Sequence, residues 1–339
     1  MFQTEIMIGL QSLHSEFLTW LMRQITATGY YSSVAAIVII VMLGINLRKG
    51  FLLFQIFAWT GMVSELCKGL FELPRPFFVD NRVQCLEPTW RAVNALHAQG
   101  APSFFSLPPP AAIDAFRLQG LSYGFPSGHA SGAVAMWGGL AVLFRKRRLD
   151  WLAPFLISLV AFTRLYLGVH FLADVLGGAL LGGLMLFFAY RLVGGDGGRQ
   201  RFFAAARISA HAALPRLLYI SLMFILPLLL VASKVIPPAS AGFFIGLNAA
   251  FTLILRQGPP ADSGSLPVRA ARVLLGGLIF LLLNRALAWG LAWLDSSPGS
   301  WPILISAGLG CFLTFWLSVQ LFLRLGLYKK GTRVQTASE

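Results

Sequence analysis

The sequence predicts an all-α, polytopic membrane protein, and three observations support this fold class. Hydrophobic residues make up 57% of the 339-residue chain. Charged residues make up only 12%, about half the share that is usual in soluble domains. The mean hydropathy is +0.72. Together these values indicate a bundle of transmembrane helices rather than a soluble core.

Nine apolar runs are long enough, or nearly long enough, to cross the hydrocarbon core of a bilayer as helices. They are residues 31–47, 51–71, 127–144, 151–168, 171–193, 217–236, 239–255, 270–294 and 301–325. Before them, residues 3–24 carry charges among leucines and lack the basic start of a signal peptide. We therefore expect about nine transmembrane helices plus an N-terminal amphipathic helix at the membrane interface.

The basic residues follow the loops between these runs. Five basic segments fall on one side of a nine-span bundle, and the positive-inside rule assigns that side to the cytoplasm. The formal net charge of +14 is then a consequence of topology, and we expect no nucleic-acid partner. The N-terminal helix would lie on the outer face.

Polar residues at helix ends concentrate in the first part of the chain. We therefore divide the sequence into a catalytic membrane domain at 1–193, with an outer loop at 77–125, and a C-terminal region of four membrane helices at 194–339. Arg285 lies inside one of these four helices, where an ionisable side chain is normally paired. We expect an ion pair with Glu65 or Glu72; a contact with a substrate head group is the alternative.

Three polar clusters come to the outer face in this topology. Residues 68–76 (KGLFELPRP) end the second span, residues 126–129 (PSGH) begin the third, and residues 163–174 (TRLYLGVHFLAD) straddle the turn between the fourth and fifth. Each cluster alone is weak evidence, because basic residues near helix ends often snorkel to the interface. Their convergence on one side predicts an active site.

The composition of this patch suits a phosphate group. Lys68, Arg75 and Arg164 supply three positive charges, and the planar guanidinium group matches phosphate oxygens. Ser127 supplies a hydroxyl. Gly128 lets a backbone N–H approach closely at a helix N-terminus, where anions are favoured.

Two histidines complete the patch. Asp174 lies four residues after His170 and hence on the same helix face. A carboxylate bonded to one ring nitrogen fixes the tautomer and leaves the other nitrogen as a nucleophile. His129 lacks an acidic neighbour in the sequence and is suited to act as the general acid. A neutral His170 and a protonated His129 predict a bell-shaped pH profile.

The patterns K-x6-RP, PSGH and R-x5-H-x3-D resemble the three signature motifs of the type 2 phosphatidic acid phosphatase superfamily, in order and spacing, over residues 68–174. Thr163 stands where the family usually has serine. The resemblance implies five phosphate ligands, namely Lys68, Arg75, Ser127, Gly128 and Arg164. It also implies that His170 forms a phosphohistidine, that Asp174 orients it, and that His129 acts first as acid and then as base. It implies no metal or other cofactor, and inhibition by vanadate.

The substrate is less determined by the sequence. The outer loop at 77–125 is interpreted either as an ordinary surface loop or as a lid that admits a lipid tail. We expect a membrane phosphatase acting on a lipid phosphate or diphosphate of the prenyl diphosphate, phosphatidate or phosphatidylglycerophosphate type. The alternatives are a glucose-6-phosphatase-like sugar phosphatase, which the nine-span layout resembles, a lipid phosphotransferase, and a lipid transporter without catalysis. We expect the bacterial inner membrane with the site facing the periplasm, or else the endoplasmic reticulum with the site facing the lumen.

Overall fold

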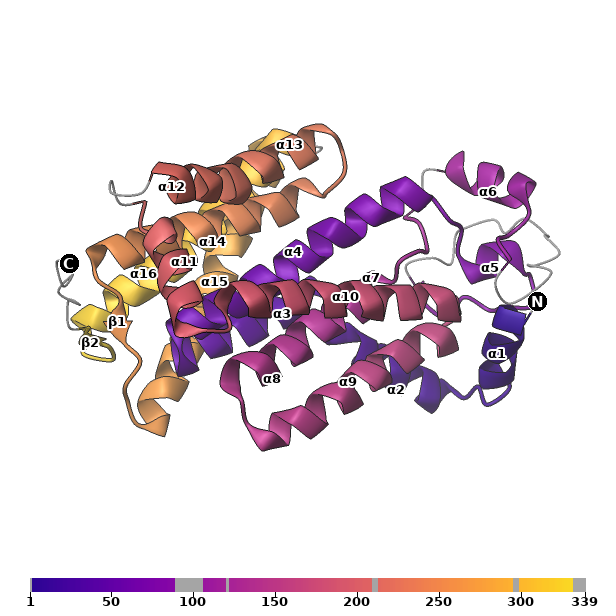
Figure 1. The fold of residues 1–339 in the computed structure, drawn as a ribbon, viewed down its shortest axis with the longest axis horizontal. Coiled ribbons are helices and arrows are strands. Elements are labelled where there is room, and N and C mark those ends of the chain that lie inside the picture. Colours follow the sequence, from indigo (N-terminus) through magenta and orange to yellow (C-terminus); the bar gives the residue numbers. More distant parts are fainter. Residues whose placement is uncertain (1, 89–105, 120–121, 209–212, 295–298, 332–339) are drawn as a thin grey trace. The chain divides into compact units, whose positions relative to one another are not determined.

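The computed structural model describes residues 2–88, 106–119, 122–208, 213–294 and 299–331 (Figure 1). In these ranges the chain is mostly helical. Strand structure within them is confined to β1 (Pro260–Ala261) and β2 (Lys329–Lys330), which pair antiparallel. The predicted all-α class is confirmed.

The chain forms two compact units. The first contains Met1–Val34 and Leu53–Tyr190, and the second contains Ala35–Leu52 and Arg191–Glu339. Helix α4 (Leu47–Phe71) runs through the boundary at residue 52. All eight predicted site residues belong to the first unit.

The first unit is a helical bundle with shorter helices at one end. Its elements are α1 (Phe2–Gln11), α2 (Glu16–Ala27), the start of α3 (Tyr31–Ile39), most of α4, α5 (Pro76–Val79), α6 (Pro110–Arg117), α7 (Gly128–Ala133), the π-helical segment η3 (Val134–Gly138), α8 (Gly139–Phe144), α9 (Arg147–Tyr166) and most of α10 (Leu172–Val193). In Figure 1, α1, α5 and α6 lie at the same end of this unit as the start of α10.

Local sequence signals explain where several of these helices begin and end. Pro76 and Pro110 occupy the first turns of α5 and α6, where a missing N–H costs no helical hydrogen bond. The side chain of Ser127 caps α7 by accepting a hydrogen bond from Ala130 N. Arg145 adopts a left-handed conformation, with φ of 50°, directly after α8 and so ends that helix.

The second unit contains the C-terminal helices. Residues 35–52, which include the π-helical segment η1 (Ile40–Ile45), also belong to it. The remaining elements are α11 (Asp196–Ala206), α12 (Ala213–Ile220), η4 (Ser221–Ile225), α13 (Leu226–Ala232), α14 (Pro238–Gln257), α15 (Leu266–Leu294) and α16 (Ser300–Arg324). Phe51 stacks on Phe251 with ring centroids 3.7 Å apart. A Cβ atom at Gly246 would collide with the carbonyl oxygen of Gly308, which shows how closely α14 and α16 approach.

Seven helices in the described ranges are long and apolar enough to cross a membrane. They are Leu47–Val79, Arg147–Tyr166, Leu172–Val193, Ala213–Ala232, Pro238–Gln257, Leu266–Trp293 and Ser300–Arg324. An eighth span results if the bent pair Glu16–Ala27 and Ser32–Ile45 is counted as one, and the helix at Gly128–Phe144 is shorter than the others. The protein is therefore a membrane protein, but the prediction of nine spans is not confirmed.

The predicted N-terminal amphipathic helix is not confirmed either. Residues 3–24 do not form one helix, because α1 and α2 are separate and Ser15 caps the second. Helix α2 packs against α9, where the hydroxyls of Thr19 and Tyr166 lie 2.9 Å apart. Its apolar side chains Phe17 and Trp20 remain exposed. The segment is thus part of the bundle: one face of α2 packs into a buried apolar cluster through Met22, and the other exposes Phe17 and Trp20.

The carboxylates suggested as partners of Arg285 are engaged within the first unit. Glu65 Oε1 lies 2.6 Å from Lys68 Nζ, and Glu72 Oε2 lies 3.0 Å from Arg117 Nε. The i,i+3 spacing of Glu65 and Lys68 on α4 explains the first pair. Arg285 itself belongs to the second unit, so its expected ion pair stays a prediction.

Candidate active site

Hydrogen bonds to backbone carbonyls bring the three predicted motifs together at one end of the first unit. Ser127 N, at the start of α7, donates to Asp174 O on α10 at 2.9 Å. Arg75, directly before α5, donates from Nη1 to Val169 O in the turn between α9 and α10, also at 2.9 Å. Residues up to 94 positions apart in the sequence therefore share one site.

His170 is buried between a carboxylate and a cation. Its Nδ1 lies 3.3 Å from Asp174 Oδ2, and its Nε2 lies 3.3 Å from Arg75 Nη1. Arginine can only donate hydrogen bonds, so Nε2 carries the lone pair in this contact and Nδ1 carries the hydrogen that Asp174 accepts. Asp174 Oδ2 also accepts from Phe171 N at 2.9 Å, which fixes the carboxylate. The ring is therefore held in the tautomer that a nucleophilic Nε2 requires.

The charge state of His170 follows from its surroundings. It lies between the spans that end at Tyr166 and begin at Leu172, and only 2% of its surface is exposed. Burial, followed by the positive charges of Arg75 and Arg164, holds its pKa well below the usual value of an imidazole. The neutral form that a nucleophile needs is consequently favoured at neutral pH.

Arg75 also fixes the segment that precedes α7. Its Nε donates to Ser122 O at 2.8 Å and its Nη2 donates to Tyr123 O at 3.3 Å. The buried guanidinium of Arg75 therefore connects the segment at Ser122–Tyr123 with the turn at Val169–His170. The side chain is thus an organiser of the site as well as a charge within it.

Lys68 lies at the end of α4 beside the start of α7. A Cβ atom built on Gly128 would be 3.6 Å from Lys68 Nζ and 3.7 Å from Ser64 Oγ. The hydroxyl of Ser64 is buried, and among the described residues it has no hydrogen-bond partner. Lys68, Ser64 and Gly128 therefore present an ammonium group, a hydroxyl and a helix N-terminus within a small volume. Such a set can bind a phosphate group.

His129 follows Gly128 on the first turn of α7 and is held by the N-terminal segment. The ring of Tyr30 meets it edge-on, with centroids 5.4 Å apart. Gly29 lies so close that an added Cβ would be 3.0 Å from His129 Cδ2. The Nε2 atom of His129 is buried and lacks a hydrogen-bond partner within the described part of the chain. A ring nitrogen in this state can give or take a proton from a bound group.

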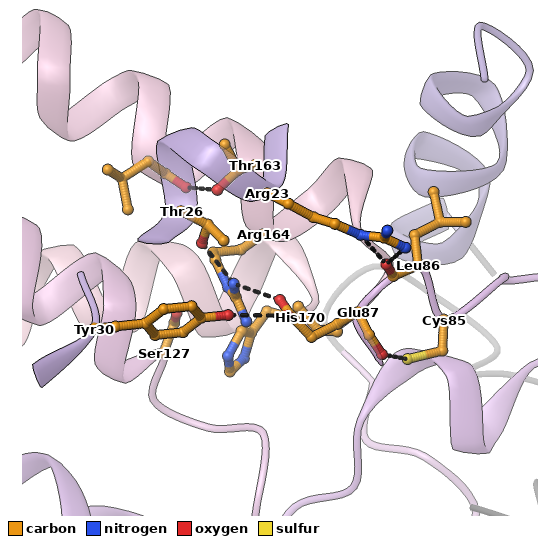
Figure 2. Close-up of polar contacts among 12 residues, drawn as sticks. Arg23, Thr26, Tyr30, Cys85, Leu86, Glu87, Ser127, Thr163, Arg164 and His170 are labelled. Carbon is orange, nitrogen blue, oxygen red and sulfur yellow. Dashed lines mark hydrogen bonds and ion pairs between the residues drawn. The ribbon is translucent and has the colours of Figure 1, made fainter. Parts of the chain in front are cut away.

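Arg164, on the last turn of α9, is held by one edge of its guanidinium (Figure 2). Its Nη1 donates to Thr26 Oγ1 at 2.6 Å and to Glu87 Oε2 at 3.4 Å. Its Nε is buried and has no hydrogen-bond partner in the described ranges. The arginine thus keeps a donor for a further acceptor such as a phosphate oxygen.

Sequence reasoning missed four residues around the site, namely Thr26, Tyr30, Ser64 and Glu87. Ser64 precedes Lys68 by four positions, so helical spacing could have placed the two on one face. The other three lie in segments without a motif, and their spacing carries no signal because they reach the site only through tertiary packing. Figure 2 shows Thr26, Tyr30 and Glu87 around Arg164.

The described parts of the outer loop help to form an apolar cluster beside the site. Phe78 of α5 and Phe116 of α6 meet edge-on at 4.8 Å, and both belong to a buried cluster that includes Met7, Met22 and Tyr166. Arg91 and His97, two residues of the outer loop that was interpreted as a surface loop or a lid, lie outside the described residues. For the described positions, no group of three or more His, Cys, Asp or Glu side chains is arranged as metal ligands are.

Comparisons with known proteins agree with the motif pattern. The sequence model of the PAP2 superfamily matches residues 49–197. A lipid A 4'-phosphatase of Bacteroides thetaiotaomicron is 40% identical over 81 residues, covering 22% of this chain and 35% of that protein. The phosphatidylglycerophosphatase B of Bacillus subtilis is 40% identical over 76 residues, covering 20% of this chain and 37% of that protein.

A third relative, the undecaprenyl-diphosphatase BcrC of Bacillus subtilis, is 36% identical over 67 residues, covering 20% of this chain and 34% of that protein. The chain thus spans about a third of the length of the curated relatives it matches. No solved structure matches it significantly. All eight predicted site residues fall inside residues 49–197, the range that matches the sequence model of the PAP2 superfamily.

Proposed function

We propose that this protein is an integral membrane phosphatase that hydrolyses a lipid phosphate or diphosphate through a phosphohistidine on His170. One observation carries the proposal. Asp174 and Arg75 flank the two ring nitrogens of His170, at 3.3 Å each, so that a buried neutral imidazole has its Nε2 lone pair beside a cation. This is the arrangement that a nucleophile for an anionic phosphate requires.

In the proposed first step, the Nε2 lone pair of His170 attacks phosphorus, and the bond from phosphorus to the leaving oxygen breaks. His129 gives its proton to that oxygen, and the alcohol or lipid phosphate departs. Hydrogen-bonded Asp174 stabilises the positive charge that develops on the ring of His170.

In the second step, His129 takes a proton from water, and the water oxygen attacks phosphorus. The N–P bond breaks, its electron pair returns to His170 Nε2, and inorganic phosphate leaves. The sum for a monophosphate is substrate plus water giving alcohol plus phosphate, and for a diphosphate it is substrate plus water giving lipid monophosphate plus phosphate. The unpartnered Nε2 of His129 among the described residues supports this double role.

The proposed site stabilises the transferred group with protein cations. Lys68, Arg75 and Arg164 would neutralise the phosphate oxygens, while Ser127 and the N–H of Gly128 would donate hydrogen bonds. Preorganised donors of this kind are typically worth about 3 kcal/mol of transition-state stabilisation each. We therefore propose activity without a metal ion, and inhibition by vanadate.

A lipid substrate is supported by the surface around the predicted ligands. Leu70 and Phe71 follow Lys68 on α4 and are 79% and 50% exposed, and Leu118 after α6 is 89% exposed. Exposed apolar side chains next to buried cations suit an amphiphile whose tail stays in the bilayer. The relatives' names point to lipid A, phosphatidylglycerophosphate and undecaprenyl diphosphate as substrate classes. We place the protein in a bacterial inner membrane with the site facing the periplasm.

The test is a phosphate-release screen with the purified full-length protein in the presence of a metal chelator. The panel contains prenyl diphosphates, phosphatidate, phosphatidylglycerophosphate, lipid A and glucose 6-phosphate. Wild type is compared with His170→Ala, and an alkaline quench of the reaction with radiolabelled substrate tests for the acid-labile phosphohistidine. The proposal is supported if the wild type releases phosphate from a lipid and His170→Ala does not.

Three outcomes of this screen would change or overturn the proposed function. Preference for glucose 6-phosphate would replace the lipid with a sugar substrate. Product formation that requires an added hydroxyl acceptor would indicate a phosphotransferase. Phosphate release that is unchanged in His170→Ala would overturn the mechanism.

A further inference from the structure

Glu87 is a buried carboxylate that belongs to none of the three motifs. It lies in the described segment after α5, and 5% of its surface is exposed. The neighbouring residue fixes this segment, because Leu86 N donates to Leu167 O at 3.1 Å and Arg23 Nε donates to Leu86 O at 2.9 Å. A buried charge is costly unless it is paired, so its partners indicate its role.

The two oxygens of Glu87 contact two different parts of the site (Figure 2). Oε2 lies 3.4 Å from Arg164 Nη1, and Oε1 accepts a hydrogen bond from Tyr30 OH at 2.9 Å. The ring of Tyr30 lies edge-on to His129 at 5.4 Å. A chain of contacts therefore runs from Arg164 through Glu87 and Tyr30 to His129.

Glu87 contacts one edge of the Arg164 guanidinium. Nη1 is shared by Glu87 and by Thr26, whose Oγ1 is 2.6 Å away. The Nε atom has no partner among the described residues. The carboxylate thus offsets the charge of the arginine and restrains its rotation, while another donor remains for a ligand.

We propose that Glu87 is a positioning residue. It holds the guanidinium of Arg164, a proposed phosphate ligand, by Nη1, and through Tyr30 it links the position of that guanidinium to the position of the His129 ring. The inference rests on the proposed phosphatase activity. Thr26 and Tyr30 precede residue 49, where the match to the family model begins. The N-terminal segment therefore supplies part of the support of the site.

The experiment uses full-length protein in lipid nanodiscs and five variants. They are Glu87→Gln, Tyr30→Phe, Arg164→Lys, the double variant of Glu87→Gln with Arg164→Lys, and Glu16→Gln as a matched control at an exposed acid on α2. The assay measures kcat and KM on the best substrate of the screen. It also measures the affinities of inorganic phosphate and of orthovanadate, a mimic of five-coordinate phosphorus, from the ligand-induced shift of the unfolding midpoint.

If Glu87 positions Arg164, Glu87→Gln lowers kcat/KM by about 10- to 100-fold, as the loss of a hydrogen bond to a charged group does. In the Arg164→Lys background the same change has an effect of less than about threefold, because the partner it acts on is gone. Tyr30→Phe changes kcat/KM in the same direction by a smaller factor. Glu16→Gln leaves kcat/KM unchanged.

The two anions separate positioning from simple charge balance. Loss of positioning weakens vanadate relative to phosphate by about tenfold, because only the transition-state mimic needs the aligned arginine. Charge balance alone would make Glu87→Gln bind both anions more tightly and in the same ratio. A lower unfolding midpoint, with an unchanged ratio of vanadate to phosphate affinity and an unchanged kcat/KM, would mean that Glu87 is only a structural residue. Tighter binding of both anions in the same ratio, or this purely structural result, overturns the inference.

Failure of this inference is distinguishable from failure of the proposed function. If the wild type releases phosphate and His170→Ala does not, the function stands whatever Glu87→Gln does. If no substrate is hydrolysed by the wild type, the function fails, and the ratio of vanadate to phosphate affinity still decides whether Glu87 positions Arg164.

Discussion

The two units of this protein are built from similar apolar helices, yet they bury different side chains. In the first unit, charged and titratable residues are buried at helix ends: His170 contacts Arg75 and Asp174, and Arg164 contacts Glu87. In the second unit, close contacts come mainly from rings and small residues, as in the stack of Phe51 on Phe251 and the approach of Gly246 to Gly308.

This difference distinguishes the unit that holds the candidate site from the unit whose buried contacts are mainly apolar packing. Buried charges are costly and persist where the protein uses or pairs them, so their concentration in one unit marks the site. The second unit has a buried cation as well, Arg272, which lies 4.3 Å over the ring of Tyr328. There the charge is covered by a ring, whereas the cations of the first unit surround a histidine. Five predictions test the comparison, in order of their expected effect on kcat/KM.

His170→Ala is expected to lower kcat by at least about 10³-fold, because no other group replaces the nucleophile. Steady-state phosphate release measures the loss. The matched control is His14→Ala, an exposed histidine between α1 and α2, which should behave as wild type. Retention of more than a tenth of the activity in His170→Ala would end the case for a phosphohistidine.

Arg75→Lys should lower kcat/KM by about 100-fold, although the positive charge is kept. Lysine cannot reproduce the planar fork that contacts Val169 O, Ser122 O and His170 Nε2 together. The control is Arg147→Lys, an exposed arginine at the other end of α9 from Arg164. Equal activities for the two variants would mean that charge alone suffices at position 75.

The pH dependence of kcat/KM should have its acid limb below the usual range of a histidine. Burial and the nearby arginines lower the pKa of His170, so the nucleophile stays neutral until the pH falls through that lowered value. Activity is then lost as the ring is protonated. A profile of log kcat/KM between mildly acidic and neutral pH measures this, and an acid limb centred at the ordinary imidazole pKa would contradict the burial of His170 in the working enzyme.

Ser64→Ala is expected to lower kcat/KM by about threefold to tenfold, the usual range for one hydrogen bond. Its hydroxyl lies beside Lys68 and Gly128 and can donate to a bound phosphate. Ser233→Ala serves as the control, because that exposed serine of the second unit donates only to its own helix in the described contacts. An increase in KM without a change in kcat would place Ser64 in binding alone.

Phe251→Ala should leave the kcat/KM of the folded protein unchanged. It should nevertheless lower the free energy of unfolding by roughly 3 to 5 kcal/mol, because a buried ring and its stack on Phe51 are lost. Thermal unfolding in nanodiscs and the kinetics of the folded fraction measure the two effects. A tenfold loss of kcat/KM in fully folded protein would show that the second unit shares in catalysis.

The sequence predicted the fold class and the assembly of the motifs better than it predicted the number of spans. Helix ends carrying Lys68, His129, Arg164 and His170 were placed together by counting apolar runs, and the structure brings the three motifs together. The span number is a weaker prediction, because helices such as Gly128–Phe144 are shorter than a regular span. Hydropathy cannot distinguish a short helix inside a bundle from a full crossing.

By itself, the sequence determined that the chain is a helical membrane protein and which motif residues are candidates for phosphate chemistry. Both conclusions rest on local properties, namely composition, periodicity and spacing along helices. Only the tertiary structure decided which residues support those candidates. Glu87, Tyr30 and Thr26 reach Arg164 and His129 through contacts between segments that are far apart in the chain. Such contacts leave no periodic pattern in a single sequence, because they depend on how whole helices pack.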